Sequence, residues 1–229
     1  MALQRPGLSA GTRAGIGAPQ FSGGVTLEAH GGYLIRIDSF AGLDLVALAR
    51  EALVQEGGPP EGGLLVTVSR RRKVVRLAYD APHTYGRRGA RWYGAHHALA
   101  ASLSQVAGAT VHAYVFDPEE YEEVIAWGNG RRVGGERVVY EDVELPEELL
   151  AGQGGEDSAQ EQAFERLRSR WPLGHLAYVL GLTRDELLRL PRAQGVLLPL
   201  EGTADAAAAL GQLMAVPPVR GMNPDSSAA

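Results

Sequence analysis

The spacing of apolar residues over positions 25–145 restricts the possible folds of this chain more than any other feature. The segment GGYLIRIDSF alternates with the period of two expected for a half-buried strand. Helical spacing follows in LDLVALAREALVQEGG and again in RWYGAHHALAASLSQVAG. Strand patterns occur in five further segments: LLVTVS, KVVRLAYD, TVHAYVFD, YEEVIAW and RVVYEDVEL. The order βαββαβββ predicts an α+β fold, with an antiparallel or mixed sheet and the helices packed on one face.

The pattern changes after this region. Residues 146–159 are polar and contain glycines, which predicts a linker, and helical spacing then predicts a small helical subdomain over 160–215. Within it, GVLLPLEG is compatible with a further strand or with an extended connection. The ends, 1–24 and 216–229, lack periodicity and are predicted to be disordered tails.

Composition restricts the chemistry. The chain has 229 residues, enough for a sizeable core, and no cysteine, which excludes disulfides, thiolate zinc sites and cysteine nucleophiles. It has no run of roughly 18 apolar residues and no signal-peptide pattern, so we expect a cytoplasmic protein without a membrane segment. The net charge of -5 argues against a general polyanion binder.

Charge is unevenly distributed. Residues 117–149 contain eleven acids and three arginines, whereas residues 70–91 contain eight basic residues and one acid. These two regions either neutralise each other within the monomer or attract a partner of opposite charge. For the second case, the candidate protein-binding residues are Glu119, Glu120, Glu122, Glu123, Arg131, Arg132 and Glu136.

The glycines between 128 and 135 superficially match a phosphate-binding loop. However, they lie between two strand patterns, no helix follows, and neither the GxGxxG spacing nor a terminal Gly-Lys-Ser/Thr is present. Asn129 and Gly130 form a dipeptide typical of a tight turn because both residues tolerate positive φ. A hairpin that displays Arg131 and Arg132 is therefore predicted.

Residues 92–142 carry a resemblance to a family. The helix WYGAHHALAASLS followed by VHAYVFDPEEYEEVIAWGNGRRVGGERVVYED resembles small uncharacterised bacterial proteins of polymorphic toxin systems, whose presumed role is immunity through toxin binding. The resemblance implies a cytoplasmic binding protein without catalytic residues. It does not account for the C-terminal helical part.

A helix-turn-helix is a candidate at residues 173–190. Ala177, Gly181 and Leu187 have the required spacing, and Thr183 is placed to cap the second helix. The acids that follow Arg184 would oppose phosphate, so a structural helical hairpin is favoured over a DNA reader. The candidate nucleic-acid-binding residues are Arg70, Arg71, Arg72, Arg87, Arg88, Arg91, Arg184 and Arg189.

Searches for catalytic motifs find no GxSxG elbow, HExxH helix, Walker loop or dinucleotide fingerprint. His83, His96, His97 and His112 lack the spacing of metal ligands, and ordinary histidines are favoured over a metal site. Aromatic residues interleave with the basic region, which leaves nucleotide or nucleic-acid handling as an alternative. No catalytic residue, metal or cofactor is assigned.

These observations favour a non-catalytic protein-binding module with a charged sheet surface, such as an immunity-type protein that neutralises a basic toxin. The alternatives are a DNA-binding regulator that uses residues 173–190 and a nucleic-acid-handling protein that uses residues 70–91.

Overall fold

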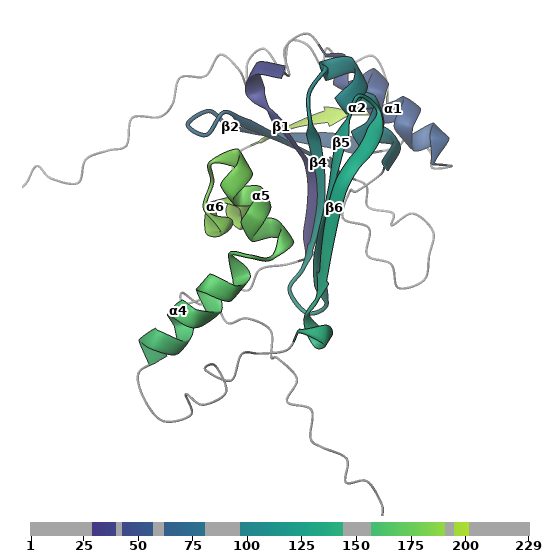
Figure 1. Cartoon of the computed structure of the whole chain (residues 1–229). Coiled ribbons are helices and arrows are strands. Elements are labelled where there is room, and N and C mark those ends of the chain that lie inside the picture. Colours follow the sequence, from purple (N-terminus) through teal and green to yellow (C-terminus); the bar gives the residue numbers. More distant parts are fainter. Residues whose placement is uncertain are drawn as a thin grey trace, which may run out of the picture.

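A computed structural model describes residues 29–39, 43–56, 62–80, 97–143, 157–190 and 195–201 (Figure 1). Its centre is a seven-stranded sheet with the strand order β6-β5-β4-β1-β3-β2-β7. Every pair of neighbouring strands is antiparallel. The predicted α+β class with an antiparallel sheet is therefore confirmed.

Strand β1 (His30–Arg36) lies in the middle of the sheet, between β3 (Val74–Asp80) and β4 (Val111–Asp117). The sequence predicts a half-buried strand here, but Tyr33 on one face and Leu34 on the other are both fully buried. Burial on both faces follows from the helices that cover each side of the sheet. The strand ends in a short 3-10 turn, η1 (Ile37–Ser39).

The two helices predicted within residues 25–145 cover one face of the sheet. They are α1 (Leu45–Gln55), which begins after the N-cap Asp44, and α2 (His97–Ala107). Their buried stripes, with Ala49, Leu53, Leu99 and Leu103 among them, pack on Tyr33 and its neighbours to form the larger core cluster. This confirms the predicted packing of these helices on a common face.

Helices from the C-terminal part cover the opposite face. They are α5 (Pro172–Leu180) and α6 (Arg184–Arg189), whose leucines form a second core cluster with Leu34, Tyr114, Phe116 and Val124. Helix α4 (Asp157–Arg168) comes before them and extends away from the sheet (Figure 1). A Cβ atom on Gly174 would lie 2.5 Å from the carbonyl oxygens of Arg168 and Ser169, so the close junction between α4 and α5 requires glycine.

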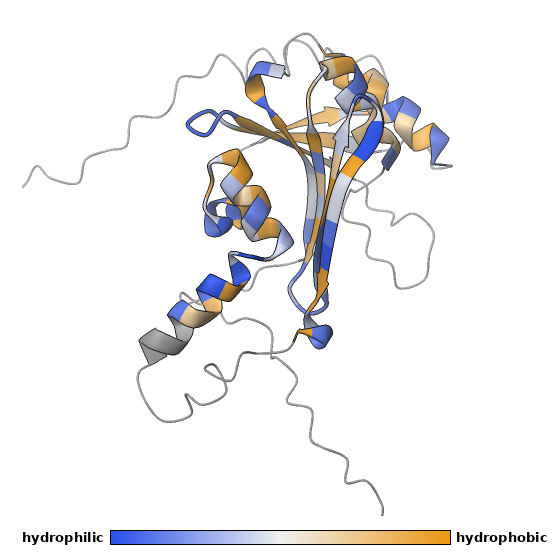
Figure 2. Ribbon diagram, viewed as in Figure 1, coloured by the Kyte–Doolittle hydropathy of each residue, from blue (hydrophilic) through white to orange (hydrophobic). Residues whose placement is uncertain are grey.

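The predicted hairpins are present. Strand β2 (Gly63–Ser69) pairs with β3 through the basic turn, and β4, β5 (Tyr121–Gly128) and β6 (Arg131–Val139) form a meander. Asn129 (φ 51°) and Gly130 (φ 74°) form the tight turn that was predicted. The meander ends in η2 (Tyr140–Asp142), and this end and the β2–β3 turn are both hydrophilic (Figure 2).

The last described strand, β7 (Gly195–Pro199), returns to the sheet and pairs with the outer edge of β2. Of the two possibilities for GVLLPLEG, the structure shows the strand. The division into domains over 25–145 and 160–215 stays a prediction, and α4 already begins inside the predicted linker. Both predicted tails and residues 202–215 lie outside the described residues.

Among the described residues, no helix combines the length and apolar character that a membrane crossing would require.

Candidate functional site

Strand β6 forms one edge of the sheet and is the most exposed of the described strands. Its residues 131–137 are all exposed, including the apolar Val133 at 64%. Within the described part of the chain, β5 is the only strand that pairs with β6. The opposite side of β6 therefore has no strand partner among the described residues, and we call this row of main-chain donors and acceptors the β6 edge.

Exposed charged residues lie at both ends of the β5–β6 hairpin. Arg131 and Arg132 lie beside α2, where the Gly130 N–H donates to the Ser104 hydroxyl at 2.9 Å. Four exposed carboxylates lie at the other end, which we call the acidic end: Glu119, Glu120, Glu141 and Asp142. The Tyr140 N–H donates to the Glu120 carbonyl at 3.0 Å, which holds the two acidic segments together. The eight residues of β5 separate the ends by about 26 Å.

Glu122, which the sequence groups with the exposed acids, is not on the surface. It is fully buried beneath α5, and its carboxylate forms an ion pair with Arg184. The same carboxylate accepts hydrogen bonds from the Leu173 N–H at 2.9 Å and the Tyr140 hydroxyl at 3.3 Å. Burial, and then the charge of Glu122, raise the pKa of Tyr140. Glu122 therefore fixes the α5–α6 pair to the sheet and does not belong to an interaction surface.

Glu123 is partly neutralised within the molecule. It lies directly opposite Arg137 on β6, and the Arg137 guanidinium stacks 4.2 Å from the centre of the Tyr121 ring. Both residues belong to the region 117–149, so this pair leaves open whether that region and residues 70–91 neutralise each other. Glu136, by contrast, projects from the other face of β6.

The basic region is divided by the fold. Arg72 forms an ion pair with Glu186 at 2.6 Å, and Arg76 is buried, where it donates to a tyrosine hydroxyl and a main-chain carbonyl. Arg70 and Arg71 lie in the β2–β3 turn. Arg87, Arg88 and Arg91 lie outside the described residues, as do His83 and His96. Of the described basic residues of this region, Arg76 is therefore buried and Arg72 is paired with α6, while Arg71 stays exposed in the turn.

The helix-turn-helix region does form a helical hairpin. Gly181 adopts φ 70° at the end of α5, and Thr183 caps α6 through a capping box with Glu186. The hydrogen bond from the Thr183 main chain, and then that from Arg72, lower the pKa of Glu186. The predicted turn and cap are confirmed.

The charged groups of α6 are engaged in internal contacts. Arg184 is directed inward to Glu122, and Arg189 pairs with Asp185 at 3.0 Å on the same helix. Leu187 and Leu188 are buried against the sheet. The N-terminal turn of α6, which a recognition helix would direct into a DNA groove, is thus bound to this protein's own sheet.

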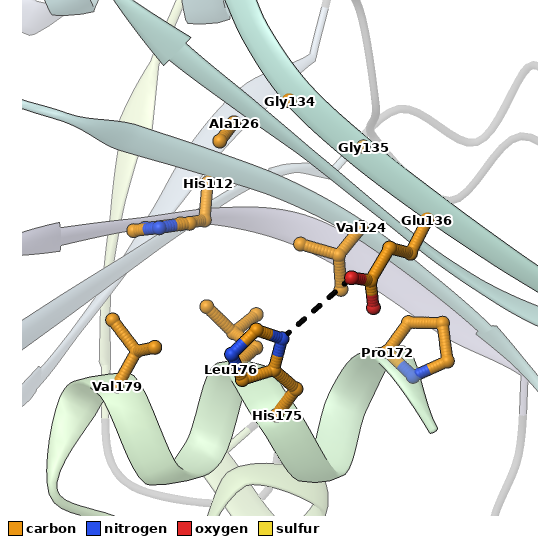
Figure 3. Close-up of a pocket in the computed structure, with 10 residues that line it drawn as sticks. All are labelled: His112, Val124, Ala126, Gly134, Gly135, Glu136, Pro172, His175, Leu176 and Val179. Carbon is orange, nitrogen blue, oxygen red and sulfur yellow. Dashed lines mark ion pairs between the residues drawn. The ribbon is translucent and has the colours of Figure 1, made fainter. Parts of the chain in front are cut away.

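A cleft lies between α5 and the β6 side of the sheet (Figure 3). Its volume is about 190 Å³. The sheet contributes His112, Val124, Ala126, Gly134, Gly135 and Glu136, and α5 contributes Pro172, His175, Leu176 and Val179. Gly134, Ala126 and His112 lie opposite one another on successive strands, so the cleft runs inward from the β6 edge along this row.

Two histidines and one carboxylate supply the polar groups of the cleft. His175 Nδ1 lies 3.8 Å from Glu136 Oε1, and both side chains are more than half exposed. Figure 3 marks this contact with a dashed line. His112 lies deeper, and its Nδ1 is buried without a hydrogen-bond partner. Burial, and then the nearby charge of Arg36, lower the pKa of His112, so its imidazole is neutral at pH 7.

The sequence places His112 among four candidate histidines but does not predict the cleft. Gly134 belongs to the glycine cluster that predicts a hairpin, and Glu136 is among the candidate binding residues. His175 and Val179 are not among the sequence candidates, although their spacing places both on one side of α5. Paired glycines in a strand are a further indication of an open or closely approached face. No group of three or more potential metal ligands occurs among the residues that the structure describes.

Comparisons with known proteins add no relative: no family model, curated protein or solved structure matches this chain.

Proposed function

We propose that this chain is a non-catalytic protein-binding module that binds its partner along the β6 edge. The observation that carries the proposal is the run of exposed residues 131–137 on a strand whose outer side is open in the described structure. Such an edge can accept an extended partner segment as an additional strand. Because β6 is held by β5, little conformational entropy is lost when its main chain binds.

The charge distribution supports a partner with basic character. The acidic end lies beyond the C-terminal part of β6, where its four carboxylates attract positive charge. Such attraction acts mainly on the association rate and weakens as salt rises. A basic toxin neutralised by this protein is the partner that best combines these features with the resemblance of residues 92–142.

The proposal is tested with a partner captured from the native organism and then purified. Neighbouring N–H groups of an edge strand point alternately to β5 and to the open side. Of Gly134→Pro and Gly135→Pro, one variant therefore removes an N–H that faces the open side, and the other removes an N–H that faces β5. We expect the variant that retains its unfolding midpoint to lose partner binding. Val133→Lys provides a second edge variant, because a charge on an edge strand opposes strand addition.

Charge-reversal variants distinguish the electrostatic attraction of the partner from its pairing with β6. Reversal of Glu119 and Glu120 to lysine is expected to slow association and flatten its salt dependence, with a smaller effect on dissociation. Reversal of Glu122 is not a valid test because that residue is buried. Partner binding that is unchanged in every folded edge variant would refute the proposal.

A further inference from the structure

The cleft opens directly onto the β6 edge. Gly134 lies at its entrance, and a Cβ atom at this position would meet nothing within 4 Å. Beyond Gly134 the next residue of the row is the small Ala126. A side chain carried by a strand added to β6 would therefore find open space leading beneath α5.

The size of the cleft limits its occupant. Small-molecule sites generally measure about 300–1,000 Å³, whereas this cleft measures about 190 Å³. This volume is more suitable for one amino-acid side chain than for a cofactor or drug-sized ligand.

The lining defines the chemistry of that side chain. Val124, Ala126, Leu176 and Val179 offer apolar walls for an aliphatic stem. Glu136 is the acidic residue of the lining, and the neutral His112 does not offset its negative charge. Its ion pair with His175 forms only when that imidazole is protonated. Arg36 lies beyond the inner end, where its guanidinium donates to the Val179 carbonyl at 3.1 Å. A cationic head group is thus favoured toward Glu136 and disfavoured toward Arg36.

We infer that the cleft receives a single arginine side chain from a partner strand paired with β6, with the guanidinium bound by Glu136 and the stem held between α5 and the sheet. This inference rests on the proposed function and specifies what the partner must carry. Arginine fits better than lysine because its planar guanidinium donates to a carboxylate in bidentate geometry and is less strongly hydrated.

Nuclear magnetic resonance of the full chain labelled with ¹⁵N tests the inference. The probe is a blocked pentapeptide of alternating threonine and valine with a central arginine, and its control carries citrulline, which has the same shape without the charge. We expect saturable shifts at Gly134, Ala126 and His175 with the arginine peptide, and binding at least tenfold weaker with the citrulline peptide. Equal affinity for the two peptides, or the absence of saturable shifts, would overturn the inference.

Two variants locate the binding. Gly134→Leu fills the entrance and should abolish the shifts, while its unfolding midpoint confirms that it folds. Glu136→Gln should remove the preference for arginine over citrulline and leave affinity for the citrulline peptide unchanged. Glu141→Gln, which alters an exposed acid outside the cleft, is the matched control. Retention of the arginine preference in Glu136→Gln, or of full binding in Gly134→Leu, would contradict the assignment.

The outcomes for the cleft and for the proposed function are separable. If edge variants lose the partner but the peptide does not bind in the cleft, only the inference about arginine fails. If the partner binds every edge variant equally, the proposed function fails whatever the peptide does.

Discussion

Glu122 joins the sheet to the C-terminal helices through charge and hydrogen bonds. Removal of its carboxylate in Glu122→Ala would leave the Arg184 charge and the Leu173 N–H without their buried partner. We therefore expect a loss of about 3–5 kcal/mol in the free energy of unfolding. Urea denaturation measures this loss.

The matched control for this prediction is Glu120→Ala, an exposed substitution two residues away. It should change the free energy of unfolding by no more than about 0.5 kcal/mol. Equal effects at the two positions would show that Glu122 has no special structural role.

His112 gives the protein a pH-dependent stability. Its pKa is lowered in the folded state by burial and then by Arg36, so the unfolded chain, with the ordinary value of 6.5, binds more protons in mild acid. Stability from the neutral imidazole is complete above pH 6.5 and is lost as the pH falls from there toward the folded-state pKa. Urea denaturation at several pH values should therefore show a steeper decline for the natural chain than for His112→Gln.

The other titratable groups of the cleft require a control. His175 and Glu136 face His112 from α5 and β6, and Arg36 approaches from β1. His175→Gln should retain the part of the pH dependence that comes from His112. If His112→Gln and the natural chain decline in parallel, the buried imidazole does not contribute.

At the scale of elements, the α5–α6 hairpin has the turn and the cap expected of a helix-turn-helix, but its charged groups are engaged in internal contacts. Arg184 is directed inward, and Arg72 of the β2–β3 turn holds Glu186 at the start of α6. We expect no shift of random duplex DNA by the purified protein, even at low salt. A shift that weakens steeply with salt and is lost in Arg189→Ala would refute this prediction.

The cap of α6 can be tested on its own. Thr183 accepts a hydrogen bond from the Glu186 N–H at 3.1 Å, and Thr183→Ala removes it. We expect a loss of about 1 kcal/mol in the free energy of unfolding, measured by urea denaturation. Thr183→Ser should retain most of the stability because serine supplies the same hydroxyl.

Local signals made much of the fold predictable. The Asn129-Gly130 turn, the Thr183 cap and the two helices of the first layer depend on residues close together in sequence. The burial of Glu122 was not predictable, because it depends on Arg184 being directed toward it from a distant helix. The cleft was missed for the same reason, since its two walls come from segments whose pairing no periodicity specifies.

At the scale of the whole molecule, the C-terminal helices and β7 are integrated with the sheet. Leucines of α5 and α6 share a core with Phe116, and β7 pairs with β2. We expect limited proteolysis between Leu150 and Gln160 to give two fragments that elute together in size-exclusion chromatography without denaturant. Fragments that separate spontaneously would show that the two parts are independent domains.

Because β7 is synthesised long after β2, the order of synthesis determines how long the outer edge of β2 stays uncovered. Over half of the sequence lies between β2 and the strand that covers its outer edge. At about 5–20 residues per second on the ribosome, that edge stays uncovered for several seconds after β2 emerges. During this interval the nascent chain presents an apolar strand to any neighbouring polypeptide, which makes early chaperone contact advantageous during biosynthesis.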